Sequence, residues 1–146
     1  MATTIRAISA EETIPLRHSV LWPDAPIEHV LLPEDASGDH FGAFLPDTHL
    51  PIAVISVFVE ALVPSSPKSA RFRKFACAPE YQGKGIGSAL LHHAASHARE
   101  KLEAHSIWCD ARVSTKAWYL KRGMEPYGEI FQKSGIDYIR MQMQLV

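Results

Sequence analysis

The stretch Gln-Gly-Lys-Gly-Ile-Gly at residues 82–87 stands between an apolar strand-like segment and an amphipathic helix-like segment. Its three glycines within five positions leave few side chains between the backbone and an approaching ligand. At the start of a helix, such a loop presents unpaired N–H groups and the positive end of the helix dipole. The stretch therefore predicts an anion site, typically for a phosphate group.

The segments after this loop predict a helix, a strand, a short helix and two strands. A stripe of apolar residues supports the first helix, and Gly123 is a suitable residue just beyond the end of the second. A turn at residues 133–135 joins the last two strands. The expected elements are a helix over 85–102, a strand over 106–111, a helix over 114–122 and strands over 124–131 and 136–145.

The segments before the loop predict four strands and one helix. Ser9 and Glu12 have the spacing of a capping box at the start of that helix. Pro15 removes a hydrogen bond, which predicts a kink or a restart before the helix ends at Trp22-Pro23. The expected strands cover residues 3–8, 40–45, 51–62 and 69–77, and residues 23–39 form a long connection with little regular structure.

This order predicts a mixed α+β sheet with helices on both faces, in a single domain over residues 1–146. The net charge of −1, without runs of like charge, argues against nucleic acid or an anionic membrane as the main partner. The chain begins without an apolar leader and has no apolar run as long as a membrane span. Its two cysteines fit a reduced, cytoplasmic protein.

Three phosphate-binding motifs compete for the glycine loop. No window has the P-loop spacing Gly-x-x-x-x-Gly-Lys-[Ser/Thr]. The dinucleotide fingerprint Gly-x-Gly-x-x-Gly has Ser88 at its third glycine position, and it should follow the first strand of a parallel unit. The pattern Gln/Arg-x-x-Gly-x-Gly/Ala is met by Gln82, Gly85 and Gly87. With this pattern the chain resembles the GNAT superfamily of acyl-CoA-dependent N-acetyltransferases.

The resemblance extends beyond the loop. Residues 78–91 resemble the pyrophosphate-binding segment of the family, and Trp-Tyr-Leu-Lys-Arg-Gly-Met at 118–124 resembles its second signature. The resemblance implies a mostly antiparallel sheet of six to seven strands, with the fourth and fifth strands splayed into a slot. It also implies transfer of an acetyl group from acetyl-CoA to a primary amine of a small molecule or peptide, by direct attack in a ternary complex. No metal is needed, and a homodimer is common in the family.

The resemblance assigns site residues one by one. The diphosphate of CoA would contact Gln82, Gly83, Lys84, Gly85, Ile86, Gly87 and Ser88. The pantetheine arm would run along the free edge of Phe75, Ala76 and Cys77. Tyr119 matches the tyrosine that protonates the departing CoA thiolate. Many family members have Asn seven residues before that tyrosine, but this chain has Arg112, so the resemblance does not imply the contact made by the Asn.

Several assignments stay open at the level of sequence. Lys84 either contacts a phosphate or is solvated. The strand residues Arg71, Arg73 and Lys74 form either a solvated face or a site for an acidic group of the substrate. A non-catalytic acyl-CoA sensor and a nucleotide-binding module are the alternative functions. Candidate general bases are Glu60, Asp110, Glu80 and His40, and candidate acceptor-lining residues are Arg17, Trp22 and His29.

Three further residues have metal-compatible or nucleophilic side chains. His93 and His97 have the i, i+4 spacing of a metal pair, but without an acidic or cysteine partner on that helix we interpret them as solvated or packed. Cys77 is interpreted as a small strand residue because direct transfer needs no acyl-enzyme.

Overall fold

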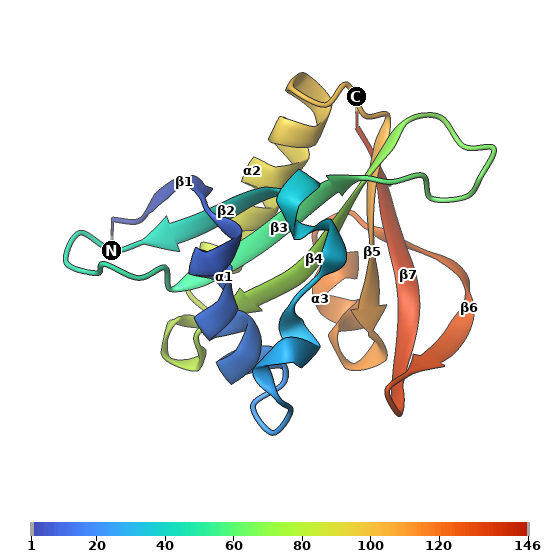
Figure 1. The fold of residues 1–146 in the computed structure, drawn as a ribbon. Coiled ribbons are helices and arrows are strands. Elements are labelled where there is room, and N and C mark those ends of the chain that lie inside the picture. The colour runs from blue at the N-terminus through green and yellow to red at the C-terminus, as the bar shows by residue number, and fades with distance from the viewer. Residues whose placement is uncertain (1, 146) are drawn as a thin grey trace. The chain divides into compact units, whose positions relative to one another are not determined.

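The structure is a computed structural model that describes residues 2–145. These residues form a seven-stranded sheet in the order β1-β2-β3-β4-β5-β7-β6 (Figure 1). The strands are β1 (Thr4–Ile8), β2 (Asp39–Phe44), β3 (Ala53–Val59), β4 (Ser69–Cys77), β5 (Ser106–Arg112), β6 (Glu125–Lys133) and β7 (Ile136–Gln144). The α-helices are α1 (Ala10–Leu16), α2 (Ile86–Glu100) and α3 (Lys116–Leu120). The predicted order of elements and the mixed, mostly antiparallel α+β class are confirmed.

The chain divides into two compact units. Unit 1 comprises Met1–Phe58 and Phe72–Ser96, and unit 2 comprises Val59–Arg71 and His97–Val146. The expectation of one domain over residues 1–146 stays a prediction. In the described part of the chain, no helix is both long and apolar enough to cross a membrane.

In unit 1, antiparallel pairing joins β1 to β2 and β2 to β3. Both β2 and β3 are buried along almost their whole length. Figure 1 shows α1 in front of these strands and the first part of α2 behind them. On the α2 side, the Phe41 and His93 rings meet with their centroids 4.8 Å apart. The apolar run at 51–62 predicts a strand buried on both faces, and β3 is such a strand, although it is shorter than predicted.

The start of α1 has the predicted capping box. The Ser9 side chain accepts a hydrogen bond from the Glu12 amide, and the Glu12 carboxylate accepts one from the Ser9 amide at 3.0 Å. At Pro15 the chain cannot donate to the preceding turn. The α-helix ends one residue later, and a wider π-helical turn (Arg17–Leu21) follows. This turn begins with Arg17, whose side chain is fully buried.

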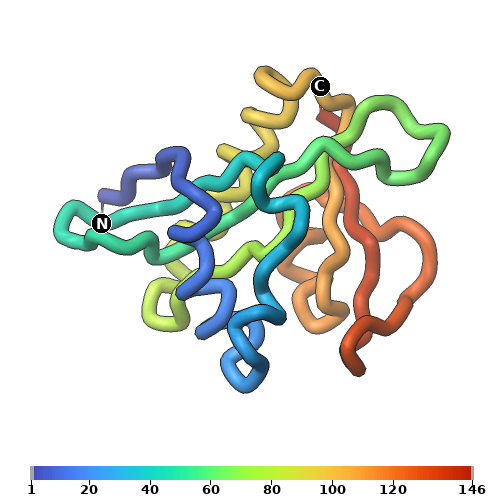
Figure 2. Tube along the Cα trace, viewed as in Figure 1, coloured from blue at the N-terminus to red at the C-terminus, as the bar shows by residue number. Residues whose placement is uncertain are grey.

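The connection from α1 to β2 has more regular structure than its composition predicts. It contains two 3-10 helices, Ile27–Val30 and Pro33–Ser37, and can be followed from blue to cyan in Figure 2. Leu31 and Leu32 between them are extended. The expectation of little regular structure over residues 23–39 is therefore only partly right.

In unit 2, β5 pairs with β7 over seven residues, and β7 pairs with β6. The β6–β7 turn has Ser134 and Gly135 at φ of 51° and 76°, as a two-residue hairpin turn requires. The opening residues of β4 pair in parallel with Ser106–Trp108 over three residues, and β4 then continues into unit 1.

The predicted helix over residues 114–122 is divided into two parts. A 3-10 turn (Val113–Thr115) precedes α3, which is only five residues long. Gly123 ends this segment with φ of 88°, and its amide donates to the Leu120 carbonyl at 3.2 Å. The predicted role of Gly123 just beyond the helix end is confirmed.

Candidate functional site

The glycine loop of unit 1 has an open, left-handed backbone. Gly83 and Gly85 have φ of 76° and 83°, and a Cβ built on either would meet no protein atom within 4 Å. Gly85 precedes α2, and its carbonyl accepts from the Ala89 amide at 3.1 Å. The first amides of α2 have no partner within the helix, so the loop and helix start can bind an anion. Glycine is needed here for its backbone conformation, while the space above it is open to a ligand.

The first residue of the loop is tied to the end of β4. The Gln82 side-chain amide donates to the Cys77 carbonyl at 2.9 Å, and the Gln82 backbone amide donates to Pro79 at 3.2 Å. One residue after β4, the Ala78 amide donates to the Ile52 carbonyl at 2.9 Å. The Gln82 side chain therefore orients the loop. The backbone of the residues after Gln82 is left for a ligand to bind.

A pocket of about 280 Å³ adjoins the loop. Its lining includes Thr3, Lys84, Gly85 and Ile86. The Lys84 ammonium lies 5.9 Å from the centroid of the Tyr81 ring. The cation is thus next to the open glycine backbone, where it adds to the positive potential of the helix start.

The end of β4 in unit 1 departs from regular strand geometry. Lys74 has φ of 54°, which is the left-handed region and marks a local irregularity of the strand. The next three residues differ in burial: Ala76 is buried, while Phe75 and Cys77 are half-buried. Burial, followed by the nearby Glu80 carboxylate, raises the pKa of the Cys77 thiol. Cys77 is accordingly a weak nucleophile, in line with its interpretation as a strand residue.

Tyr119 lies on α3 in unit 2 and is only 8 % exposed. Its side chain lies close to that of Cys109 on β5. Burial, followed by the proximity of Cys109, raises the pKa of Tyr119 well above its ordinary value. The phenol is protonated at neutral pH, as an exposed tyrosine is, and the raised pKa makes it a weaker acid.

Three of the four candidate general bases already have hydrogen-bonding partners. His40 is buried, with Nδ1 2.7 Å from Ser56 Oγ and Nε2 2.9 Å from the Asp35 carbonyl oxygen. Since a carbonyl only accepts, Nε2 carries a hydrogen and donates it to Asp35, while Nδ1 shares a hydrogen bond with the Ser56 hydroxyl. Neither nitrogen of His40 is then available to a substrate.

Asp110 is held as a carboxylate by surrounding cations. Burial raises its pKa, but the hydrogen bond from Arg140 and the charges of Arg71, Arg140 and Lys133 outweigh burial, and the net pKa is lowered. A carboxylate stabilised in this way is a poor proton acceptor. Glu60 is more exposed, but its carboxylate accepts from Arg71 at 3.0 Å. Glu80 is exposed.

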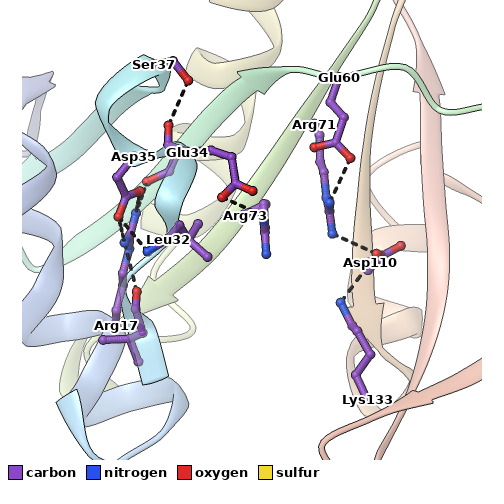
Figure 3. A network of polar contacts seen from close by, with 12 residues as sticks. Arg17, Leu32, Glu34, Asp35, Ser37, Glu60, Arg71, Arg73, Asp110 and Lys133 are labelled. Atoms are coloured by element: carbon purple, nitrogen blue, oxygen red, sulfur yellow. Dashed lines mark hydrogen bonds and ion pairs between the residues drawn. The ribbon is translucent and has the colours of Figure 1, made fainter. Parts of the chain in front are cut away.

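A second polar network fixes the α1–β2 connection within unit 1. Arg17 donates to both oxygens of Asp35 at 2.8 and 2.9 Å (Figure 3). It also donates to Val30 O at 3.1 Å and to Ser56 Oγ at 2.9 Å. Arg17 is 0 % exposed, so this side chain is a structural clamp and does not line a substrate site. From the sequence alone, Arg17 is a candidate residue lining the acceptor site, because its neighbours in the chain do not indicate that its side chain is buried.

The other residues of interest have simpler surroundings. The Trp22 and His29 rings contact each other at 4.4 Å between centroids. Cys77 and Cys109 are free thiols. Among residues 2–145, no group of three or more metal-ligating side chains comes together.

Sequence reasoning missed a charged network in unit 2, which we call the charged face. It consists of Glu60, Arg71, Asp110, Lys133 and Arg140, most of which are labelled in Figure 3. Asp110 and Arg140 are register partners on β5 and β7. The available signal was the charged residue Asp110 within the largely apolar β5, but pairing it with Arg140 requires the strand register.

Comparisons with known proteins agree with this architecture. The family model described as "Acetyltransferase (GNAT) domain" matches residues 51–145. An uncharacterized N-acetyltransferase of Bacillus subtilis (strain 168), YitI, is 34% identical over 134 residues, covering 90% of this chain and 89% of that protein.

Two solved structures share the fold over the full length of both chains. One is a Lactobacillus plantarum protein provisionally assigned as an N-acetyltransferase, with a TM-score of 0.84 and 19% identity. The other belongs to the NatC complex bound to Gag peptide and CoA, with a TM-score of 0.76 and 14% identity.

Proposed function

The chain belongs to the GNAT superfamily of acetyltransferases, and on that premise we propose that it transfers an acetyl group from acetyl-CoA to a primary amine. The amine belongs to a small molecule or a peptide and attacks the thioester directly in a ternary complex. The observation that carries the proposal is the glycine loop at the start of α2, with open space above Gly83 and Gly85.

The loop suits a diphosphate for three physical reasons. Its backbone exposes N–H groups that no Cβ covers. The fifteen-residue helix behind it has its positive dipole end there. Lys84 adds a full positive charge beside the pocket. In this proposal residues 82–88 bind the diphosphate of CoA, Gln82 by orienting the loop and the others mainly through their backbone.

The end of β4 is proposed to bind the pantetheine arm. An extended ligand segment can hydrogen-bond to Phe75, Ala76 and Cys77 as an added strand does. The Cys77 carbonyl already accepts from Gln82, so it has reduced capacity for the arm. A backbone N–H near the irregularity at Lys74 would stabilise the negative charge that develops on the thioester oxygen.

Tyr119 is proposed as the general acid. The amine nitrogen forms a bond to the carbonyl carbon, the carbon–sulfur bond breaks, and the sulfur leaves with the electron pair. The Tyr119 hydroxyl then gives its proton to this thiolate. The amine loses one proton to water or to an exposed carboxylate, and the Tyr119 phenolate takes up one proton from solvent, so the net products are the amide and CoA with its thiol protonated. Because its pKa is raised, the phenol is a weaker acid than an exposed tyrosine, so we expect it to donate only as negative charge develops on the leaving sulfur.

Two measurements test this function. Calorimetric titration of the purified chain with acetyl-CoA should show one binding site. A screen of amines, amino acids, polyamines and peptide N-termini should find at least one that releases CoA and becomes acetylated. Absence of acetyl-CoA binding contradicts the proposal. Tight binding without transfer to any amine would instead favour a non-catalytic acyl-CoA sensor.

A further inference from the structure

The charged face covers one side of the sheet in unit 2. Alternate residues of β5 point to opposite sides, and Cys109 contacts Tyr119 of α3 on one side. Its neighbours Trp108 and Asp110 therefore lie on the other side, together with Arg71 and Arg140. That other side has charged side chains where a sheet usually has apolar ones.

Close ion pairs connect the members of the charged face. Arg71 donates to Glu60 Oε2 at 3.0 Å and to Asp110 Oδ2 at 2.9 Å. Arg140 donates through Nε to Asp110 Oδ1 at 2.9 Å. The Lys133 ammonium lies 3.6 Å from Asp110 Oδ2. Three cations thus face two carboxylates, and the cluster has an excess of one positive charge.

Aromatic rings hold these cations in place. The guanidinium groups of Arg71 and Arg140 lie 4.7 and 4.1 Å from the Trp108 ring centroid. Trp108 Nε1 also donates to the Glu60 carbonyl oxygen at 2.9 Å. The Lys133 ammonium lies 4.6 Å from the centroid of the Tyr138 ring. Cations fixed in this way lose little conformational entropy when they bind an anion.

The network is an unfavourable way to stabilise a sheet. The Asp110 side chain is only 6% exposed, and Arg71 Nε is buried with no hydrogen-bond acceptor among the described residues. Buried ion pairs are often no more stabilising than apolar side chains of similar size. Departures of this kind from good packing tend to occur at functional sites.

We propose that the charged face binds the carboxylate of the acceptor, so that the acceptor is an amine that also carries a carboxylate, as amino acids do. Assigning this carboxylate to the acceptor rests on the proposed transferase function. The planar carboxylate matches the guanidinium groups, as Asp110 and Glu60 already show. Glu60 is the more exposed of the two, at 43% against 6%. The incoming carboxylate displaces Glu60 from Arg71 and gains the positive charge of Lys133.

The experiment compares matched acids and amides that need no catalysis. N-Acetylglycine, N-acetylphenylalanine and their carboxamides are titrated into the protein, and binding is followed by NMR at the backbone amides of unit 2. The acids should shift the amides around Asp110 and Arg140 and bind at least roughly 10-fold more tightly than the amides. Equal binding of acids and amides, or shifts elsewhere only, would overturn the proposal.

Three variants sharpen the result. Lys133→Gln should weaken acid binding roughly 3- to 10-fold, and Glu60→Gln should strengthen it roughly 2- to 5-fold by releasing Arg71. Lys121→Gln removes an exposed lysine just beyond α3 and should change nothing. Weaker acid binding in Glu60→Gln, or equal effects of Lys133→Gln and Lys121→Gln, would refute the role of the charged face.

Titration with acetyl-CoA is run in parallel. If the protein binds the acids but not acetyl-CoA, only the transferase proposal is wrong. If it binds acetyl-CoA and transfers the acetyl group but shows no preference for acids over amides, only the carboxylate proposal is wrong.

Discussion

Replacing Gly85 by alanine should weaken the binding of CoA far more than it weakens the fold. Gly85 has φ of 83°, and a Cβ there meets no protein atom within 4 Å. The added methyl group therefore causes no clash inside the protein. It does occupy the space that a diphosphate must enter to reach the backbone N–H groups.

The expected magnitudes differ for folding and for binding. An alanine in the left-handed region costs about 1–2 kcal/mol of unfolding free energy, which lowers the melting temperature by a few degrees. A lost hydrogen bond between a backbone amide and a charged phosphate oxygen costs about 1.5–3 kcal/mol. The dissociation constant for CoA should then rise by roughly 10- to 100-fold.

Gly135 provides a matched control for this variant. It has φ of 76°, it also has no protein atom within 4 Å of a built Cβ, and it lies in the β6–β7 turn. Gly135→Ala should lose similar stability in urea unfolding and bind CoA like the parent protein in calorimetry. If both variants bind CoA equally well, the diphosphate does not lie on the loop backbone and our reasoning about its glycines is wrong.

Three further predictions concern single side chains. Tyr119→Phe should lower kcat by roughly 100-fold or more without changing the dissociation constant of acetyl-CoA, and an unchanged kcat in this variant would remove Tyr119 from the mechanism. The protonated phenol is the active form and its pKa is raised, so ionisation of Tyr119 should not lower the kcat of the parent protein up to about pH 10. Asp35→Asn should cost about 3–5 kcal/mol in urea unfolding because it leaves Arg17 buried without its partner charge. Burial raises the pKa of Asp35, but the hydrogen bonds from Arg17 and the Leu32 amide lower it more. The stability that the Asp35 carboxylate gives the parent protein is therefore present above about pH 4 and is lost as the pH falls through the lowered pKa. If the difference in unfolding free energy between parent and variant stays the same in acid, this account is wrong. Ser9→Ala should cost about 1 kcal/mol by removing the cap of α1, and a cost near zero would show that the cap adds nothing to stability.

Local sequence signals predicted most of the fold. The bounds of β4 agree with the predicted strand, and the Ser9 cap, the Gly123 helix end and the 133–135 turn are all present. Each depends on a few neighbouring residues whose backbone preferences are strong. The divided helix before Gly123 and the two 3-10 helices of the α1–β2 connection were missed, because such short turns have weak local signals.

The candidate site was predicted only where the chemistry is in the backbone. The loop over residues 82–88 needs glycines at given positions, and their spacing is visible in the sequence. The candidate bases depend on partners that the sequence does not identify. His40 and Asp110 proved to be occupied by Ser56, Asp35 and the arginines.

By itself, the sequence determined the order of elements, the glycine loop at the start of a helix and membership of the acetyltransferase family, since these depend on local conformation and on motifs a few residues long. Only the tertiary structure decided which charges meet. Arg71 and Asp110 are 39 residues apart in the chain, and Arg140 and Asp110 are 30 apart. They come together because parallel and antiparallel pairing places Arg71, Trp108, Asp110 and Arg140 on one face of the sheet. A shift of one residue in either register would turn these side chains to the opposite face.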